Sequence, residues 1–236
     1  MRFLLCLLLF VTIGFSQTKP LIMKHADSLA AMKRSGYLLL KGYVHFVHDS
    51  VQFKTMRATW NRNADIVQCE GDFLFTHPNG FIKAKSGIYQ KRIEFDSASG
   101  NVEAKESLGE YAFFGERLQY ERIKKILTMP LRPVLHHYSK NKDKNGEIDT
   151  LSIKADWISY KQDDEFAEAF KNVVLEHNGM TVTCDTGYFN KKENWISMKG
   201  NPKCLLENHE LSGDSIFLRL TPDGKGLKSA LVIQNA

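Results

Sequence analysis

Apolar and polar residues alternate over short stretches of this chain, in the period-two pattern of β-strands. The stretch from Gly71 to Gly100 shows it best: an apolar run at 71–75, a turn signal at 77–80 and a second apolar run at 81–84. Side chains of a strand point alternately to opposite faces, so this pattern indicates strands with one buried face. The window therefore predicts two strands and two turns.

The same pattern recurs at a nearly fixed interval. Ala84 is followed five residues later by the aromatic Tyr89 and sixteen residues later by Gly100. The same spacing, perfect or degenerate, starts from register positions 26, 55, 84, 115, 155, 184 and 213, so that four of the six intervals are 29 residues and the others are 31 and 40. A fixed period of this length predicts stacked structural repeats.

Apolar columns support the repeat independently of the glycines. Two residues before the register positions stand Phe53, Ile82, Phe113, Ile153, Val182 and Leu211. Eleven residues after them stand Tyr37, Ile66, Phe95, Ile126, Phe166 and Trp195. Such columns predict that equivalent side chains lie one above another in successive layers.

The repeat predicts one elongated all-β domain over residues 17–236, in which two facing sheets enclose a continuous apolar seam. A layer of two strands cannot bury its apolar face alone, so its neighbours must stabilise it. The fifth unit is eleven residues longer than 29, and the excess falls in the polar segment 139–149, which predicts a surface excursion. The seam is either an ordinary filled core or a groove for an apolar ligand, and the sequence leaves both open.

Residues 1–16 predict an export signal rather than part of the fold. Met1-Arg2 is positive, residues 3–15 are almost wholly apolar, and small residues precede a cleavage site near Ser16. Thirteen helical residues span about 20 Å, less than the roughly 30 Å of a bilayer core. We therefore expect the protein to be exported to the periplasm and cleaved.

Charge and cysteine content narrow the function further. Without Arg2 the mature chain has 31 basic and 27 acidic residues, a net charge of +4, and the two signs are interspersed. This balance gives no indication of nucleic-acid binding. Cys69, Cys184 and Cys204 show no CxxC spacing, so one disulfide with one thiol, or three buried thiols, are both compatible with the sequence.

Catalytic and metal-binding motifs find no support. Gly213-Asp214-Ser215-Ile216 matches the start of a hydrolase block, but no histidine follows Ser215 to act as a base. His45 and His48 are three apart, which on a strand places them on opposite faces. We expect no catalytic activity, no cofactor and no metal.

The recurring motifs resemble those of the LptA/OstA family of periplasmic lipopolysaccharide-transport proteins. The segments 26–29, 155–160, 200–202 and 211–216 resemble its "A-D-x-L/A-x-Y … G-N-V/P … L-x-G/A-D" pattern, although Met56 and Lys85 stand where an acidic residue is usual. The resemblance covers essentially the whole mature chain. It implies an open antiparallel β-jelly-roll, or β-taco, whose apolar interior holds the acyl chains of lipid A.

The resemblance also implies a site and partners. The residues expected to line the lipid-binding groove are Val44, Phe46, Phe53, Phe73, Phe75, Ile82, Val102, Phe113, Leu118, Ile126, Ile153, Ile158, Val173 and Val182. Lys54 and Lys83 are expected to contact phosphate groups. The expected partners are lipopolysaccharide, LptC-like inner-membrane and LptD-like outer-membrane proteins joined by end-strand pairing, and further copies of the chain joined head to tail.

Two other functions fit the same sequence. One is an LptC-like member of the machinery that keeps its N-terminus as a membrane anchor. The other is an exported structural β-solenoid or adhesion module with a filled seam and no ligand.

Overall fold

The computed structural model describes residues 19–32, 36–142, 148–177, 179–206, 209–221 and 227–234. The expected export signal lies outside these residues. Within them every regular element is a β-strand, as the repeat predicts, and no helix is long and apolar enough to cross a membrane. Residues 25–32 and 163–171, where the sequence has only weak helical patterning, form strands and turns.

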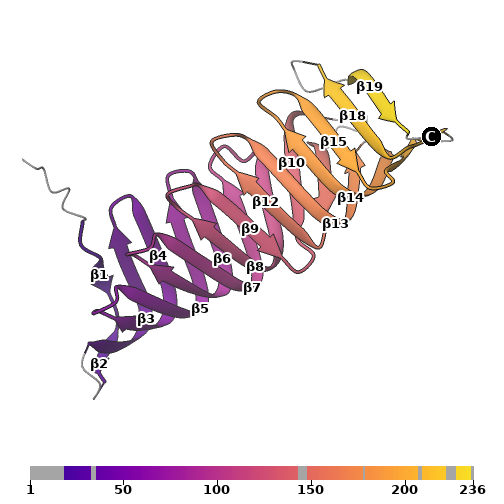
Figure 1. The fold of residues 1–236 in the computed structure, drawn as a ribbon. Helices are drawn as coiled ribbons and strands as arrows, with labels where there is room; N and C mark the ends of the chain where they lie inside the picture. The colour runs from indigo at the N-terminus through magenta and orange to yellow at the C-terminus, as the bar shows by residue number, and fades with distance from the viewer. Residues whose placement is uncertain are drawn as a thin grey trace, which may run out of the picture.

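The strands follow one another along an elongated, twisted body (Figure 1). They are β1 Ile22–His25, β2 Ser28–Ala31, β3 Tyr37–His48, β4 Val51–Asn61, β5 Ile66–His77, β6 Gly80–Gln90, β7 Phe95–Glu106, β8 Tyr111–Glu121, β9 Ile126–Pro130, β10 Val134–Lys142, β11 Ile148–Lys154, β12 Trp157–Lys161, β13 Phe166–His177, β14 Met180–Asn190, β15 Trp195–Lys199, β16 Lys203–Leu206, β17 His209–Ser212, β18 Ser215–Leu220 and β19 Leu227–Ile233.

Each long strand crosses from one sheet to the other through a bend. Strand β4 pairs with β3 and β5 along both of its halves, and the register shifts in the middle, between Lys54 and Arg57. We call the sheet that contains Phe53 the first sheet and the sheet that contains Trp60 the second sheet. Elsewhere the bend interrupts the strand, so that β9 and β10 together correspond to one long strand, as do β11 and β12.

The bend explains the spacing of the glycines. At six bends, within a long strand or between its two halves, two successive residues have φ in the left-handed region. This conformation is unfavourable for residues other than glycine. These pairs are Gly42-Tyr43, Gly71-Asp72, Gly100-Asn101, Leu131-Arg132, Lys171-Asn172 and Gly200-Asn201. The residue after the register position packs on this bend, and Asn172 Nδ2 donates a hydrogen bond of 2.9 Å to Asp156 Oδ2. The glycine column is thus the line along which the two sheets join.

Equivalent side chains stack along the interior, as the repeat predicts. In the first sheet successive cross-strand neighbours form one row from Phe46 to Val182, and all of its members are buried. The row is Phe46, Phe53, Phe75, Ile82, Ala104, Phe113, Leu135, Ile153, Leu175 and Val182.

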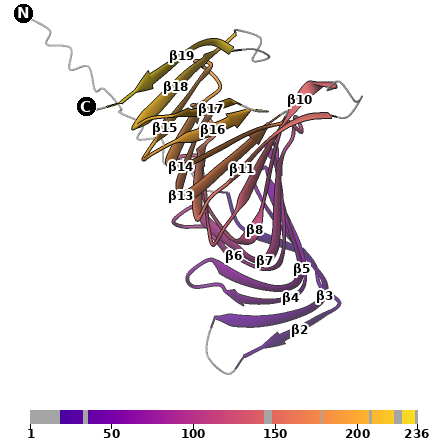
Figure 2. The ribbon, with the colours of Figure 1, turned by 90° about the vertical axis from the view of Figure 1, so that its right-hand side faces the viewer.

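The two longer intervals of the repeat correspond to longer hairpins. Four residues connect β7 to β8, against two between β5 and β6. The polar excess at 139–149 extends β10 to Lys142 and starts β11 at Ile148, so this hairpin rises beyond the rest of the body (Figure 2). The excursion is therefore an extended hairpin, with residues 143–147 outside the described part of the chain.

Candidate functional site: a cleft between the two sheets

Two rows of hairpin turns, one from each sheet, face each other on the side opposite the bends. We call the opening between them the mouth. The first sheet contributes turns such as 77–80, and the second contributes turns such as 122–125 and 162–165. Polar contacts cross the mouth: Asn79 Nδ2 donates to Gln162 Oε1 at 3.4 Å, and Lys191 Nζ pairs with Glu110.

The interior is filled near the N-terminal end of the body. Phe46 and Phe53 stack with ring centroids 5.0 Å apart, Phe53 stacks on Tyr89 at 4.7 Å, and Trp60 meets Phe46 edge-on at 5.2 Å. Aromatic pairs in such geometries stabilise a core beyond their buried area. In this part of the body the seam is an aromatic core.

A cleft opens in the middle of the body, between the two sheets at the mouth. It contains about 540 Å³ of space between atoms, part of which is open solvent. Its walls are almost entirely apolar and come from both sheets. They include Phe75, Phe81, Ile82, Phe113, Tyr120, Leu127 and Tyr160.

The rim of the cleft is polar and carries two lysines. Lys105 comes from the first sheet and Lys125 from the second, and both side chains are about two-fifths exposed. Lys105 Nζ lies 2.9 Å from Glu103 and Lys125 Nζ lies 2.8 Å from Asp163. Exposed ion pairs contribute little to stability, so both ammonium groups could turn to another anion at low cost. Glu106 lines the same rim, so the cleft combines an apolar interior with a polar rim that carries charges of both signs.

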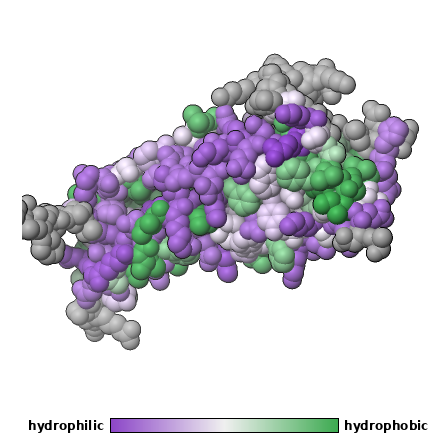
Figure 3. Space-filling model, turned by 45° about the horizontal axis from the view of Figure 1, so that its top comes forward, coloured by the Kyte–Doolittle hydropathy of each residue, from purple (hydrophilic) through white to green (hydrophobic). Residues whose placement is uncertain are grey.

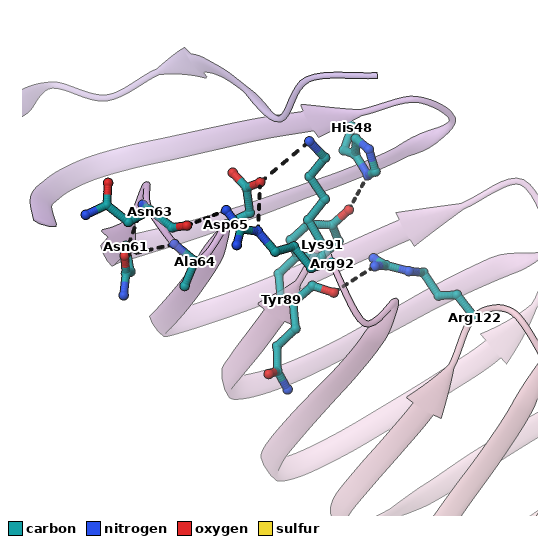
Figure 4. Close-up of polar contacts among 10 residues, drawn as sticks. His48, Asn61, Asn63, Ala64, Asp65, Tyr89, Lys91, Arg92 and Arg122 are labelled. Carbon is teal, nitrogen blue, oxygen red and sulfur yellow. Dashed lines mark hydrogen bonds and ion pairs between the residues drawn. The ribbon is translucent and has the colours of Figure 1, made fainter. Parts of the chain in front are cut away.

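A buried ion pair separates the aromatic core from the cleft. The Arg122 guanidinium lies 3.2 Å from Asp96, donates to the Gln90 carbonyl oxygen at 3.0 Å and covers the Tyr89 ring at 4.4 Å. The Tyr89 hydroxyl forms a hydrogen bond with Nδ1 of His48, which comes from the opposite side of the mouth (Figure 4). Cations above an aromatic face are stabilised by the ring quadrupole.

Burial dominates the electrostatics of this group. It raises the pKa of Asp96 to about 7, although Arg122 opposes the shift. It also lowers the pKa of His48, and the positive charges of Lys91 and Arg122 lower it further. Near the aromatic core the mouth therefore favours a neutral imidazole at neutral pH.

The residues expected to line the groove lie largely in the interior. Those with buried side chains are Val44, Phe46, Phe53, Phe73, Phe75, Ile82, Val102, Phe113, Leu118, Ile153, Ile158, Val173 and Val182. Phe75, Ile82 and Phe113 line the cleft. Ile153, Ile158, Val173 and Val182 line a second, narrower apolar gap toward the C-terminal end, where the space between atoms, open solvent included, is about 390 Å³. Phe46 and Phe53 belong to the aromatic core.

Three of the expected site residues lie elsewhere. Ile126 is half-buried, and strand alternation puts its side chain on the face opposite to that of Leu127, which lines the cleft. Lys54 and Lys83 are exposed on the outer face of the first sheet, between inward-pointing neighbours. Their contact with phosphate stays a prediction.

Asp96 and Arg122 were not predicted as site residues, although the sequence contains a signal for Asp96. Asp96 stands twelve residues after a register position, where other units have Val67, Leu127, Ala167 and Ile196. A carboxylate in an apolar column indicates a buried partner, which Arg122 supplies. The lysines of the rim have no comparable signal in the sequence. They lie next to hairpin turns, and the bends of the strands decide which turn of the other sheet lies across the mouth from them.

The cysteines and the histidines form no metal or redox centre in the described part of the chain. Cys69, Cys184 and Cys204 are free thiols, and burial raises the pKa of each, to about 11 for Cys184. No group of three or more potential metal ligands occurs among the described residues. His45, on β3, instead forms a hydrogen bond of 3.2 Å between its Nε2 and Gln52 Oε1.

Comparison with known proteins gives a structural likeness. No protein-family model and no curated protein matches this chain significantly. Among solved structures it is similar to the crystal structure of LptH, the LptA-homologous periplasmic component of the lipopolysaccharide transport device from Pseudomonas aeruginosa. The two are 16% identical with a TM-score of 0.43, and the match covers 56% of this chain and 94% of LptH.

Proposed function

We propose that this protein is a periplasmic carrier that binds the acyl chains of lipopolysaccharide between its two sheets, as a bridge between the inner and the outer membrane. The observation that carries this proposal is the apolar cleft with a polar rim in the middle of the body. The export signal expected at residues 1–16 and the recurring LptA/OstA-like motifs support the same function.

The geometry of the cleft matches the chemistry of an anionic amphiphile. Burying one CH₂ group contributes about 0.8 kcal/mol, so a twelve-carbon chain contributes on the order of 9 kcal/mol before entropic costs. Lys125 stands where a negatively charged head group would leave the cleft. Each contact with an exposed lysine adds at most about 1 kcal/mol, so the acyl chain dominates the affinity.

Photo-crosslinking in living cells tests this proposal with a matched pair of positions. Phe113 faces the cleft, whereas its neighbour Phe114 faces outward and packs on His136 at a ring distance of 5.3 Å. A photoreactive amino acid at position 113 should trap lipopolysaccharide, and the same residue at position 114 should not. Ile82, which is buried and lines the cleft, offers a second position.

The absence of a lipid adduct at both Ile82 and Phe113 would contradict the carrier function. A protein that also yields no bound lipid in native mass spectrometry after purification from its host would instead be a structural β-solenoid. The mass of the mature protein separates a cleaved carrier from an LptC-like, anchored one, because an anchor would keep residues 1–16.

Partner binding through the terminal strands belongs to the same proposal. Within the described residues β1 and β2 pair only with β3 on one side, and β19 pairs only with β18. Both ends expose apolar side chains, such as Leu29 and Leu231, and apolar side chains gather near the C-terminal end of the body in Figure 3. Unpaired strand edges accept further strands, from membrane-bound partners or from another copy of this chain.

A further inference from the structure

Two tyrosine hydroxyls at the cleft are buried without a hydrogen-bond partner. Tyr160 lines the cleft and is 5% exposed, and Tyr111 lies behind it with 1% exposure and a ring distance of 5.1 Å. Neither hydroxyl oxygen has a partner among the described residues by the distance and angle that a hydrogen bond requires. A buried polar group without a partner destabilises a fold, so such groups are rare unless a ligand or another polar group supplies the missing hydrogen bond.

The two hydroxyls cannot satisfy each other completely. If a small movement lets one donate to the other, a single O–H donor still remains without an acceptor. Burial raises the pKa of both hydroxyls, so both stay protonated donors at physiological pH. The nearest other rings are Phe113, 5.4 Å from Tyr160, which has no acceptor, and His137, 4.9 Å from Tyr111, with which the Tyr111 hydroxyl makes no hydrogen bond.

Resting on the proposed function, we infer that Tyr160, backed by Tyr111, selects acyl chains that carry an acceptor oxygen near the head group. Such an oxygen is the hydroxyl of a 3-hydroxyacyl chain or the carbonyl of an ester-linked chain. It enters below the polar rim at Asn79 and Lys125 and meets the Tyr160 hydroxyl on the apolar wall. A plain hydrocarbon fills the same cleft but leaves the donor unsatisfied.

Matched fatty acids test this selection on the purified protein. Tetradecanoic acid, 3-hydroxytetradecanoic acid and 3-acetoxytetradecanoic acid share the carboxylate head group and the chain length. They differ only at carbon 3, which carries no oxygen, a hydroxyl acceptor or an ester carbonyl acceptor. We expect the wild-type protein to bind an oxygen-bearing probe about five- to tenfold more tightly than tetradecanoic acid in isothermal titration calorimetry. In the Y111F/Y160F variant the preference should disappear while tetradecanoic acid binds as before.

Two further measurements separate selection from a structural role. Tyr188 lies on the outer face near Phe166, so Tyr188→Phe should leave the preference unchanged. Without ligand, Y111F/Y160F should melt at the same temperature as wild type or higher, because the change removes unsatisfied hydroxyls. A structural hydrogen bond would lower the melting temperature instead.

The outcomes distinguish the inference from the proposed function. Equal binding of all probes by the wild-type protein, or a preference that survives in Y111F/Y160F, would overturn the selection by tyrosine and leave the carrier function intact. If no probe binds and position 113 traps no lipid, the carrier function itself is wrong.

Discussion

Asp96 is the charged side chain that the structure buries in the core, with 3% of its surface exposed. Its partner Arg122 comes from the turn after β8 and reaches back over Tyr89. A buried pair gains little over an apolar pair of similar size, but a single buried charge is costly. The pair therefore adds little to the free energy of unfolding. Its main effect is to restrict which side chains can pack against this layer.

Removing one partner should be far more harmful than removing both. We expect Asp96→Ala to lower the free energy of unfolding by about 3–5 kcal/mol, because Arg122 stays buried without its carboxylate. The double variant D96L/R122M should recover most of that loss. Urea denaturation followed by circular dichroism measures both.

An exposed ion pair provides the control. Lys154 and Glu176 lie 2.8 Å apart on the surface of the first sheet, so Glu176→Ala should cost less than about 1 kcal/mol. If Asp96→Ala costs no more than Glu176→Ala, the pair is not buried in solution as described.

At the scale of elements, the bend is what turns a strand pattern into two sheets. Gly200 has φ of 78°, and a methyl group there would lie 2.5 Å from Asp185 Cβ. Gly109 has nearly the same φ, 74°, in the turn between β7 and β8, but a methyl group there would have no atom within 4 Å. Alanine substitutions at these two glycines therefore distinguish the cost of backbone strain from the cost of a steric clash.

We expect Gly109→Ala to cost about 1 kcal/mol from left-handed backbone strain alone. Gly200→Ala should cost at least about 1 kcal/mol more, because β15 and β16 would have to move away from the strand that carries Asp185. The two unfolding free energies, measured side by side by chemical denaturation, check the difference. Equal costs would mean that the bend tolerates a side chain, as it does at Leu131.

The elements could be predicted from the sequence because the repeat records their bends and turns. The column of Gly42, Gly71, Gly100 and Gly200 marks left-handed residues, and the pattern of Phe53, Ile82 and Phe113 marks an inward row. These signals are local, since each arises within one layer. They were sufficient for the fold class and the stacking.

The facing of some columns could not be predicted in the same way. Each even-numbered strand shifts its inward phase at the bend, from Phe53 and Thr55 to Ala58. The turns that follow decide which of two adjacent residues points inward, as with Ile126 and Leu127. Whether the seam is filled or open depends on contacts between layers, such as Arg122 on Tyr89, which no single layer encodes.

At the scale of the whole molecule, the two free ends predict self-association. Leu29 on β2 and Leu231 on β19 are both at least half exposed at opposite ends of the body. We expect sedimentation velocity to show a concentration-dependent increase in mass for the wild-type protein. Leu29→Lys and Leu231→Lys should each shift the population toward the monomer, because a charge at a strand edge opposes pairing.

A turn residue provides the control for this experiment. Leu108 is 77% exposed in the β7–β8 turn, away from both ends, so Leu108→Lys should leave the association unchanged. A wild-type protein that stays monomeric at all concentrations, or an equal effect of Leu108→Lys, would contradict head-to-tail pairing.

The regular bends also make the length of this protein adjustable. A tandem duplication of 29 residues between two bends would add two strands, or about 10 Å, and each new layer would meet the same kind of neighbour as the old one. The length of such a body is therefore set by gene duplication in fixed steps, without redesign of its interior.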